Sequence, residues 1–391
     1  MSVLEAIAPP PQASCPPRLP FEQIVLVLQG GGALGAYQGG VYAALAEHGL
    51  HPDWVAGISI GAINAALIVG NPPEARAEKL RAFWNAVTRD HLFSGVARSL
   101  QMFGHTTPRS VSNQLSAASA MFAGVPGLFS PRWPAPWLSP AGAWEPYDTR
   151  PMRLTLERLV DFDRINAGPT RLSVGAVNVR TGRMVYFDTE THRIRAEHIV
   201  ASAALPPGLP SVEIDGEHYW DGGIVSNSPL QYMAQAGPRR DTLAFQVDLW
   251  SGDGEAPLSF DQALVRQKEI QFSSRTRDHS SRFAEEQKLR GLLARLLAKL
   301  PPEIQRSAEA QALAHVADRK VASVVHFDYA SRAYEGASKD YEFSRTSMEE
   351  HWASGYETAL RALADPQTLA RPDNPEGFAF RDVSTNEGEA A

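Results

Sequence analysis

The sequence predicts an α/β fold with a mainly parallel central sheet. Two short apolar segments, 24–28 and 54–58, are each followed by a segment of helical composition. Strands that alternate with helices form parallel sheets, because a parallel connection has to cross back over the sheet. The alternation returns between residues 151 and 250. The chain has 43% hydrophobic and 21% charged residues, which is typical of a globular protein.

The predicted elements follow in chain order. Gly49 ends a helix at 36–49, and Asn71 with two prolines ends a helix at 61–70. Beyond an irregular stretch at 91–150, we expect one helix and then three strands, at 152–160, 172–179, 184–188 and 243–250. From about residue 258 the chain is mainly helical and charged, with one more strand at 321–329. The tail after about residue 366 is expected to be loosely ordered.

Charge and cysteine content exclude several classes of protein. The formal net charge is −7, whereas a nucleic-acid-binding protein needs a basic surface. The single cysteine, Cys15, excludes an internal disulfide framework. The N-terminal residues lack the features of a secretory signal, and no apolar run approaches the ~20 residues that span a bilayer. We therefore expect a cytoplasmic protein.

A glycine-rich loop follows the first strand. Gly30, Gly32 and Gly35 fit the pattern G-x-G-x-x-G between a strand and a helix. That pattern is the fingerprint of dinucleotide binding, in which backbone N–H groups hold a pyrophosphate. The same N–H groups can also stabilise an oxyanion that exists only during a reaction. The loop alone does not distinguish a resident nucleotide from a transient oxyanion.

A second motif, G-x-S-x-G, follows the second strand at Gly57, Ser59 and Gly61. Between a strand and a helix this pattern is typical of a nucleophile elbow, which exposes the serine hydroxyl at the N-terminus of the helix. A chance match is the alternative, because only three positions are specified. The strand–helix context argues against chance.

The two motifs together favour acyl transfer over nucleotide binding. A dinucleotide site has an acidic residue at the end of the second strand, whereas Ser59 lies there and Asp53 precedes the strand. The ends of neighbouring parallel strands open on one edge of the sheet, so the two loops should be adjacent. We therefore expect an oxyanion hole at Gly30, Gly31 and Gly32, formed mainly by the last two amides.

Asp221 is the best candidate for the base that a serine nucleophile needs. It follows a short aromatic segment and precedes Gly222 and Gly223. Taken alone, Asp-Gly is a common turn sequence. The two upstream motifs in this order favour a catalytic role.

The three ordered motifs resemble those of the patatin-like phospholipases. The stretch ALPPGLP at 204–210 is also similar to that family, and the resemblance covers about residues 23–250. It implies a three-layer α/β/α sandwich and hydrolysis of lipid acyl esters through an acyl-enzyme. It also implies a Ser59–Asp221 dyad without histidine, cofactor or metal. One position departs from the pattern, since Leu34 stands where the family usually has Arg or Lys.

The sequence predicts three regions. We expect residues 1–22 to be a disordered arm because of their prolines, and residues 23–250 to be the catalytic domain, with 91–150 inserted as a cap over the strand ends. Residues 251–391 form a mainly helical C-terminal extension, similar to one in a bacterial branch of the family.

Two other functions stay open. An α/β-hydrolase would use a Ser–Asp–His triad, with Ser59, Asp221 and one of His279, His315, His326 and His351. A non-catalytic protein would bind a nucleotide at Gly30–Gly35. Neither H-x-x-x-H nor C-x-x-C spacing occurs, so no metal site is predicted.

The expected partner is a lipid or another acyl ester, with transient contact to a membrane surface. The aromatic residues of 91–150 fit either an acyl pocket or a membrane interface, or else a small core of the cap itself. The helix at 261–300, amphipathic over 289–300, fits membrane or partner contact, although packing on the protein body is commoner. The acyl chain length, the headgroup and the oligomeric state do not follow from the sequence.

Overall fold

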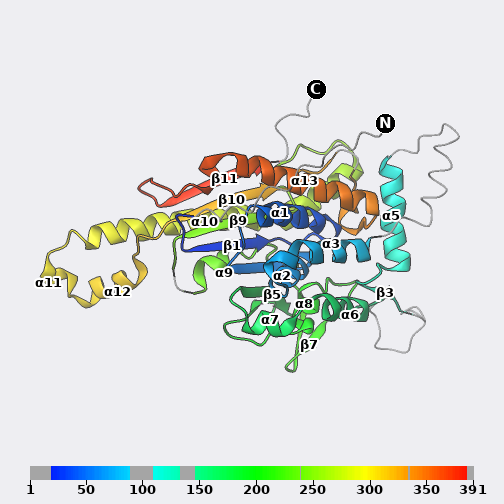
Figure 1. Ribbon diagram of the computed structural model, residues 1–391, viewed down its shortest axis with the longest axis horizontal. Helices are drawn as coiled ribbons and strands as arrows, with labels where there is room; N and C mark the ends of the chain where they lie inside the picture. Colours follow the sequence, from blue (N-terminus) through cyan, green and yellow to red (C-terminus); the bar gives the residue numbers. More distant parts are fainter. Residues whose placement is uncertain (1–18, 89–108, 133–145, 238, 333–334, 385–391) are drawn as a thin grey trace, which may run out of the picture.

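The structure is a computed structural model that describes residues 19–88, 109–132, 146–237, 239–332 and 335–384. Its centre is a mixed nine-stranded sheet, and its main path has the order β11-β10-β9-β1-β2-β5-β8-β7, with β6 paired to β5. The six strands from β11 to β5 are parallel, and β6, β7 and β8 pair antiparallel. The predicted α/β class with a mainly parallel sheet is confirmed (Figure 1).

The strands of this sheet are β1 (Gln23–Leu28), β2 (Trp54–Ile58), β5 (Arg171–Asn178), β6 (Met184–Asp188), β7 (Val212–Ile214), β8 (Glu217–Asp221), β9 (Thr242–Asp248), β10 (Ala322–Asp328) and β11 (Phe378–Ser384). Two further short strands, β3 (Ser130–Pro131) and β4 (Tyr147–Asp148), pair with each other. The α-helices are α1 (Ala36–Glu47), α2 (Ile60–Val69), α3 (Arg76–Val87), α5 (Arg109–Ala123), α6 (Arg150–Leu159), α7 (Phe162–Ala167), α8 (Ala196–Ser202), α9 (Leu230–Gln235), α10 (Phe260–Leu297), α11 (Pro302–Gln305), α12 (Ala308–Val316) and α13 (Arg345–Ala364). The short 3-10 turns are η1 (Gly32–Gly35), η2 (Pro73–Ala75), η4 (Gly222–Ile224), η5 (Lys339–Tyr341) and η6 (Pro366–Leu369).

Side chains of β1 alternate between two apolar clusters, one on each face of the sheet. Leu26 and Leu28 join the larger cluster, which includes buried residues of α1, α2, α3 and α13. Val25 and Val27 join the smaller cluster, against which residues of α9 and α10 pack. Both faces of the sheet are therefore covered by helices, as a three-layer sandwich requires.

The region after residue 250 contributes more to the sheet than predicted. The expected strand at 321–329 is present as β10 and pairs parallel to β9. The prediction of a loosely ordered tail is wrong for residues 378–384, which form β11 beside β10. The sequence of β11, FAFRDVS, lacks a clear alternation of apolar and polar residues, so its periodicity does not mark it as a strand.

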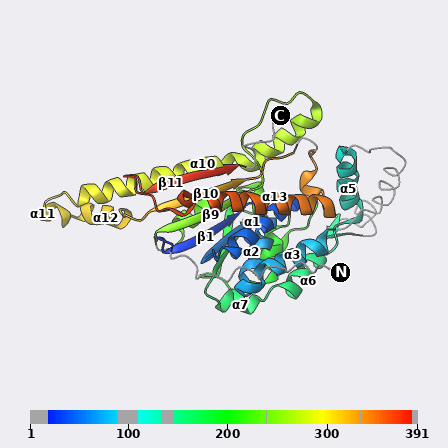
Figure 2. The same cartoon turned by 45° about the horizontal axis from the view of Figure 1, so that its top comes forward.

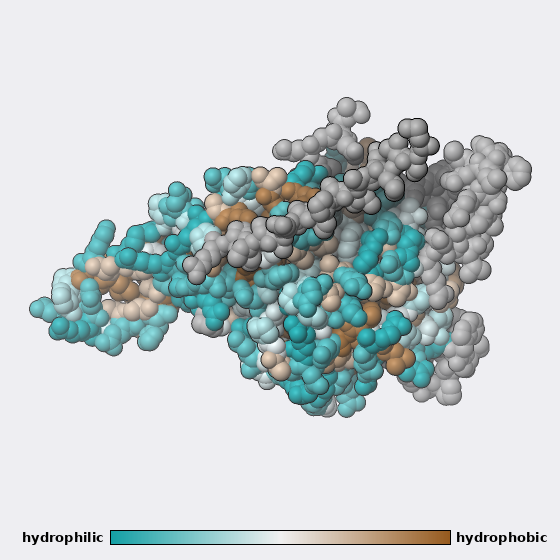
Figure 3. Space-filling model, in the orientation of Figure 1, coloured by the Kyte–Doolittle hydropathy of each residue, from teal (hydrophilic) through white to brown (hydrophobic). Residues whose placement is uncertain are grey.

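Helix α10 leaves the body of the protein and continues into an arm completed by α11 and α12, at the end of the molecule opposite to α5 (Figures 1 and 2). Leu289, Leu292 and Leu296 of α10 are 56%, 47% and 56% exposed. The space-filling view shows apolar side chains among hydrophilic ones on this arm (Figure 3). Helix α10 contacts α12 on the arm, and Arg295 of the predicted amphipathic segment donates a hydrogen bond to the Pro375 carbonyl.

Part of the insertion at 91–150 and residues 1–18 of the predicted arm lie outside the described residues. The described part of the insertion contains α5 and the β3–β4 pair. Within the described chain, no helix is both long and apolar enough to cross a membrane.

Candidate active site

Ser59 lies at the turn between β2 and α2, at the N-terminus of the helix. A Cβ atom on Gly57 would lie 2.2 Å from the carbonyl oxygen of Gly61, and one on Gly61 would lie 2.3 Å from the carbonyl oxygen of Leu28. Only glycine therefore fits at these two positions. The contact with Leu28 also brings the elbow against the end of β1, where the glycine loop begins.

The backbone of Ser59 is strained. Its φ is 57° and its ψ −125°, a conformation that residues with a side chain rarely adopt. The Ser59 N–H donates a hydrogen bond to the Ser202 hydroxyl at 3.0 Å, and this hydroxyl donates to the Gly175 carbonyl at 2.6 Å. These contacts hold the turn in its strained form.

We expect Ser59→Gly to be more stable than Ser59→Ala by about 1 kcal/mol, because glycine relieves the backbone strain and both variants lose the hydroxyl. Urea unfolding of the two variants measures the difference. At Ser354, in the interior of α13, the same pair should show the opposite order, since glycine destabilises a helix. Equal stability of the two Ser59 variants would show that the turn stores no strain.

Asp221 ends β8, and its side chain is 2% exposed. Its carboxylate accepts a hydrogen bond from the Gly223 N–H at 2.7 Å, and the Ser59 side chain lies near enough to lower its pKa. Burial raises the pKa of Asp221 to about 6, against the opposing effects of the Ser59 side chain and the Gly223 N–H. The carboxylate is therefore basic for an aspartate but still ionised at neutral pH.

The glycine loop lies beside these two residues. The Gly30 carbonyl accepts hydrogen bonds from Asn227 Nδ2 at 2.9 Å and from Trp250 Nε1 at 3.0 Å. A Cβ on Gly30 would lie 2.9 Å from the Ser59 Cβ, so glycine is needed for this close approach. Within the described residues, neither the Gly31 nor the Gly32 N–H donates a hydrogen bond. Two backbone donors are thus free next to the serine.

A cavity of about 600 Å³ opens over this site. Ser59, Asp221 and the loop Gly30–Gly32 form part of its lining. Most of the remaining wall is apolar, and its apolar residues include Ile60, Ile63, Met121, Leu128, Phe129, Met152, Leu205, Leu209, Phe272 and Phe343. The cavity therefore suits an acyl chain whose reacting group lies at Ser59.

Comparison with known proteins agrees with this geometry. A family model described as "Patatin-like phospholipase" matches residues 26–234, which is more than half of the chain. The chain belongs to the patatin-like phospholipase family. A second model, described as "Patatin phospholipase", matches residues 270–375. The family resemblance found in the sequence is thus confirmed.

Two curated proteins are similar to this chain over part of their length. The chain is 29% identical over 217 residues to "Patatin-like phospholipase domain-containing protein ZK370.4" of Caenorhabditis elegans, a match covering 55% of this chain. It is 25% identical over 247 residues to "Lysophospholipase NTE1" of Yarrowia lipolytica, a match covering 62% of this chain. The matches span only 13% and 14% of the relatives' own lengths.

Among solved structures, VipD from Legionella pneumophila is similar at 12% identity, with coverage of 89% of this chain and 66% of that chain and a TM-score of 0.33. At this score the likeness adds nothing to the fold described above.

The C-terminal region of this patatin-like protein contributes to the cavity, which the sequence did not predict. Phe272, Asp340, Tyr341 and Phe343 line it together with Ser59 and Asp221. A Cβ on Gly32 would lie 2.1 Å from the Asp340 carbonyl oxygen, so η5 lies directly against the glycine loop. No local motif marks these residues, because only the long-range packing of the chain brings them to the site.

Leu34 is completely buried and does not line the cavity. It packs in the larger apolar cluster with residues of α1 and α2. At this position, where the family usually has a cation, the protein has a core residue. The structure thus favours a packing role for Leu34.

The described candidate histidines lie outside the lining of the cavity at Ser59 and Asp221. No histidine is among the described residues that line the cavity. His326 is on β10, and although its burial lowers its pKa, hydrogen bonds with Asp248 and Asp382 raise the pKa to about 10. His351 bonds Glu335, and His315 is exposed on α12. His279 belongs to α10, but its side chain lies outside the described part.

No group of three or more His, Cys, Asp or Glu side chains in the described chain is arranged to hold a metal ion.

Proposed function

We propose that this protein is a lipid acyl hydrolase that cleaves a carboxylic ester by means of a Ser59–Asp221 dyad. One observation carries the proposal: the serine of a strained elbow and a buried aspartate with a raised pKa meet at the end of a large apolar cavity. Membership of the patatin-like phospholipase family supports the same reaction class.

In the proposed reaction, the Ser59 oxygen forms a bond to the ester carbonyl carbon while its proton passes to Asp221. The carbonyl oxygen becomes an oxyanion, which the N–H groups of Gly31 and Gly32 stabilise together with the N-terminus of α2. The carbon–oxygen bond to the alcohol then breaks, and the alcohol leaves with the proton from Asp221. Water attacks the acyl-enzyme by the same route and releases the acid and free Ser59.

The lining favours a neutral or zwitterionic ester over an anionic one. The described residues that line the cavity include the two acids Asp221 and Asp340 and no lysine or arginine. Lys268 is already paired with Asp340, so an anionic headgroup would meet the Asp221 carboxylate without a free cationic partner in the described wall.

A panel of substrates and nucleotides tests ester hydrolysis against the alternative function, nucleotide binding. We expect turnover of p-nitrophenyl esters and of neutral or zwitterionic acyl lipids, with slower turnover of anionic ones, and no turnover in Ser59→Ala. NAD, FAD and ATP should leave the melting temperature unchanged. A nucleotide at 100 times its dissociation constant would add about 2.7 kcal/mol of stability. A clear shift without ester turnover would favour a nucleotide-binding protein.

We also infer transient contact with a lipid surface near the cavity. Met121 lines the cavity and is 54% exposed, and its neighbour Phe122 is 84% exposed. Large apolar side chains in this position suit insertion into the lipid interface.

We expect Phe122→Ser to lower turnover of phosphatidylcholine vesicles about tenfold, the factor that corresponds to burial of one large apolar side chain. Turnover of a soluble short-chain ester should change little. Leu313→Ser, on the distant arm, is the matched control, since Leu313 is 42% exposed. Equal losses for the two variants on vesicles would contradict contact at the cavity end.

A further inference from the structure

The polar side chains that line the cavity are mostly committed to other partners. Asn227 Nδ2 and Trp250 Nε1 both donate to the Gly30 carbonyl. The Tyr147 hydroxyl donates to the Met121 carbonyl. Asp340 accepts from Lys268, at 2.8 and 3.1 Å. These contacts build the wall and leave few donors for a substrate.

Tyr341 differs from the other donors in the wall. It lines the same cavity, and its hydroxyl has no hydrogen-bond partner among the described residues. Burial raises the pKa of Tyr341 above its usual range, as do the nearby charges of Asp340 and Asp221. The phenol is therefore protonated throughout the pH range in which the enzyme would work, and it can donate a hydrogen bond.

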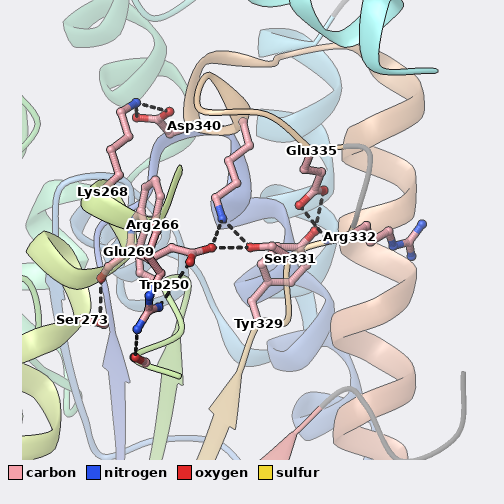
Figure 4. A network of polar contacts seen from close by, with 12 residues as sticks. Trp250, Arg266, Lys268, Glu269, Ser273, Tyr329, Ser331, Arg332, Glu335 and Asp340 are labelled. Carbon is pink, nitrogen blue, oxygen red and sulfur yellow. Dashed lines mark hydrogen bonds and ion pairs between the residues drawn. The ribbon is translucent and has the colours of Figure 1, made fainter. Parts of the chain in front are cut away.

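A buried polar network fixes the turn η5 that carries Tyr341 (Figure 4). The ammonium of Lys339, the first residue of η5, contacts Glu269 of α10 at 3.0 Å and also bonds Ser331. The Lys268 ammonium pairs with Asp340 and lies 5.3 Å from the centre of the Tyr341 ring. Tyr341 is thus held from both sides of the turn, so it is a preorganised part of the wall.

The turn η5 also contacts the glycine loop Gly30–Gly32. Lys339 Nζ lies 5.0 Å from the centre of the Trp250 ring, and Trp250 in turn holds the Gly30 carbonyl. The Asp340 carbonyl lies against Gly32. The position of Tyr341 is therefore coupled to the position of the two free glycine amides.

We propose that Tyr341 is a substrate-contacting residue whose hydroxyl donates a hydrogen bond to an oxygen of the alcohol part of the ester. This inference rests on the proposed function. In the proposed reaction the glycine amides bind the ester carbonyl oxygen, and the apolar wall contacts the acyl chain. An acyl chain placed against the Tyr341 hydroxyl would leave a buried donor without a partner, which is unfavourable. The alcohol part, with its oxygens, is the group that satisfies this donor.

The test compares Tyr341→Phe with the wild type on two esters of the same fatty acid. One is a monoacylglycerol, whose alcohol part carries two hydroxyl oxygens, and the other is the p-nitrophenyl ester, whose alcohol part has no hydroxyl group. We expect kcat/KM to fall about 10- to 100-fold on the monoacylglycerol and less than about threefold on the p-nitrophenyl ester. Tyr356→Phe, which removes a surface phenol hydroxyl bonded to Glu47, should leave both values unchanged.

The melting temperature of Tyr341→Phe should match that of the wild type, because the lost hydroxyl has no partner in the described protein. An equal loss on both esters, or no loss on either, would overturn the role of Tyr341 and leave the proposed hydrolase intact. Failure of the wild type to turn over either ester would overturn the hydrolase and this inference together. If Tyr341→Phe melts at a lower temperature than the wild type, Tyr341→His provides a second comparison. Histidine supplies a ring with an N–H donor, so this variant should recover part of the preference for the monoacylglycerol.

Discussion

Ser59→Ala should lower kcat for ester hydrolysis by several orders of magnitude, up to about 10⁶, the loss typical of a serine hydrolase deprived of its nucleophile. The reason is that no acyl-enzyme can form without the Ser59 hydroxyl. Steady-state kinetics on a p-nitrophenyl ester measures the loss directly. A circular dichroism spectrum and a cooperative melt must show that the variant is folded.

Ser202→Ala is the matched control for Ser59→Ala. It removes a serine hydroxyl that only supports the elbow, through its bond to the Ser59 N–H. We expect a smaller loss from it than from Ser59→Ala. A folded Ser59→Ala protein that retains most of its activity would rule out Ser59 as the nucleophile.

Asp221→Asn should lower kcat by about 10²–10⁴, because asparagine keeps the shape of the side chain but does not accept the serine proton. His326→Gln and His351→Gln should have far smaller effects on kcat, since neither side chain lines the cavity. A larger loss from one of these histidine variants would instead favour a Ser–Asp–His triad.

The raised pKa of Asp221 predicts two opposite dependences on pH. The base must be ionised, so kcat/KM should fall as the pH drops below about 6. A carboxyl group whose pKa is raised by folding binds its proton more tightly in the folded state. Its contribution to stability is therefore lost as the pH rises from about 3.8 to about 6.

Asp221→Asn has no carboxyl group at this buried position, so it does not lose stability through ionisation there as the pH rises. The variant should be more stable than the wild type above pH 6, and the difference should vanish below about pH 4. Urea unfolding at pH 4 and pH 8 checks this. Such a result would mark Asp221 as a residue kept for activity at a cost in stability.

Much of the architecture could be predicted because its signals are local. The strands β1 and β2 are short apolar runs that end in glycine-rich turns, and their sequence order sets a parallel sheet. The pairing of β11 with β10 could not be predicted in the same way. It joins segments about fifty residues apart, and nothing in FAFRDVS states which neighbour it has.

The residues of the candidate site also fall into two groups, those marked by a local motif and those placed only by long-range packing. Ser59 and Asp221 could be singled out because each stands in a short motif whose turn geometry needs glycine at fixed positions. Tyr341 and Trp250 could not, because their places depend on how the C-terminal region folds back over the loop. The Lys339–Glu269 contact that holds this arrangement joins residues 70 positions apart. Spacing along the chain carries no signal for such a contact.

The central claim is that Ser59 is the nucleophile of an ester hydrolase, and covalent trapping tests it most directly. The full chain is incubated with a p-nitrophenyl alkylphosphonate, which mimics the tetrahedral intermediate, and its peptides are mapped by mass spectrometry. We predict one adduct per chain, on Ser59, formed in step with the loss of activity, and a slower reaction in Asp221→Asn. An adduct on another residue that accounts for the loss of activity, or full inhibition with Ser59 unmodified, would contradict the account.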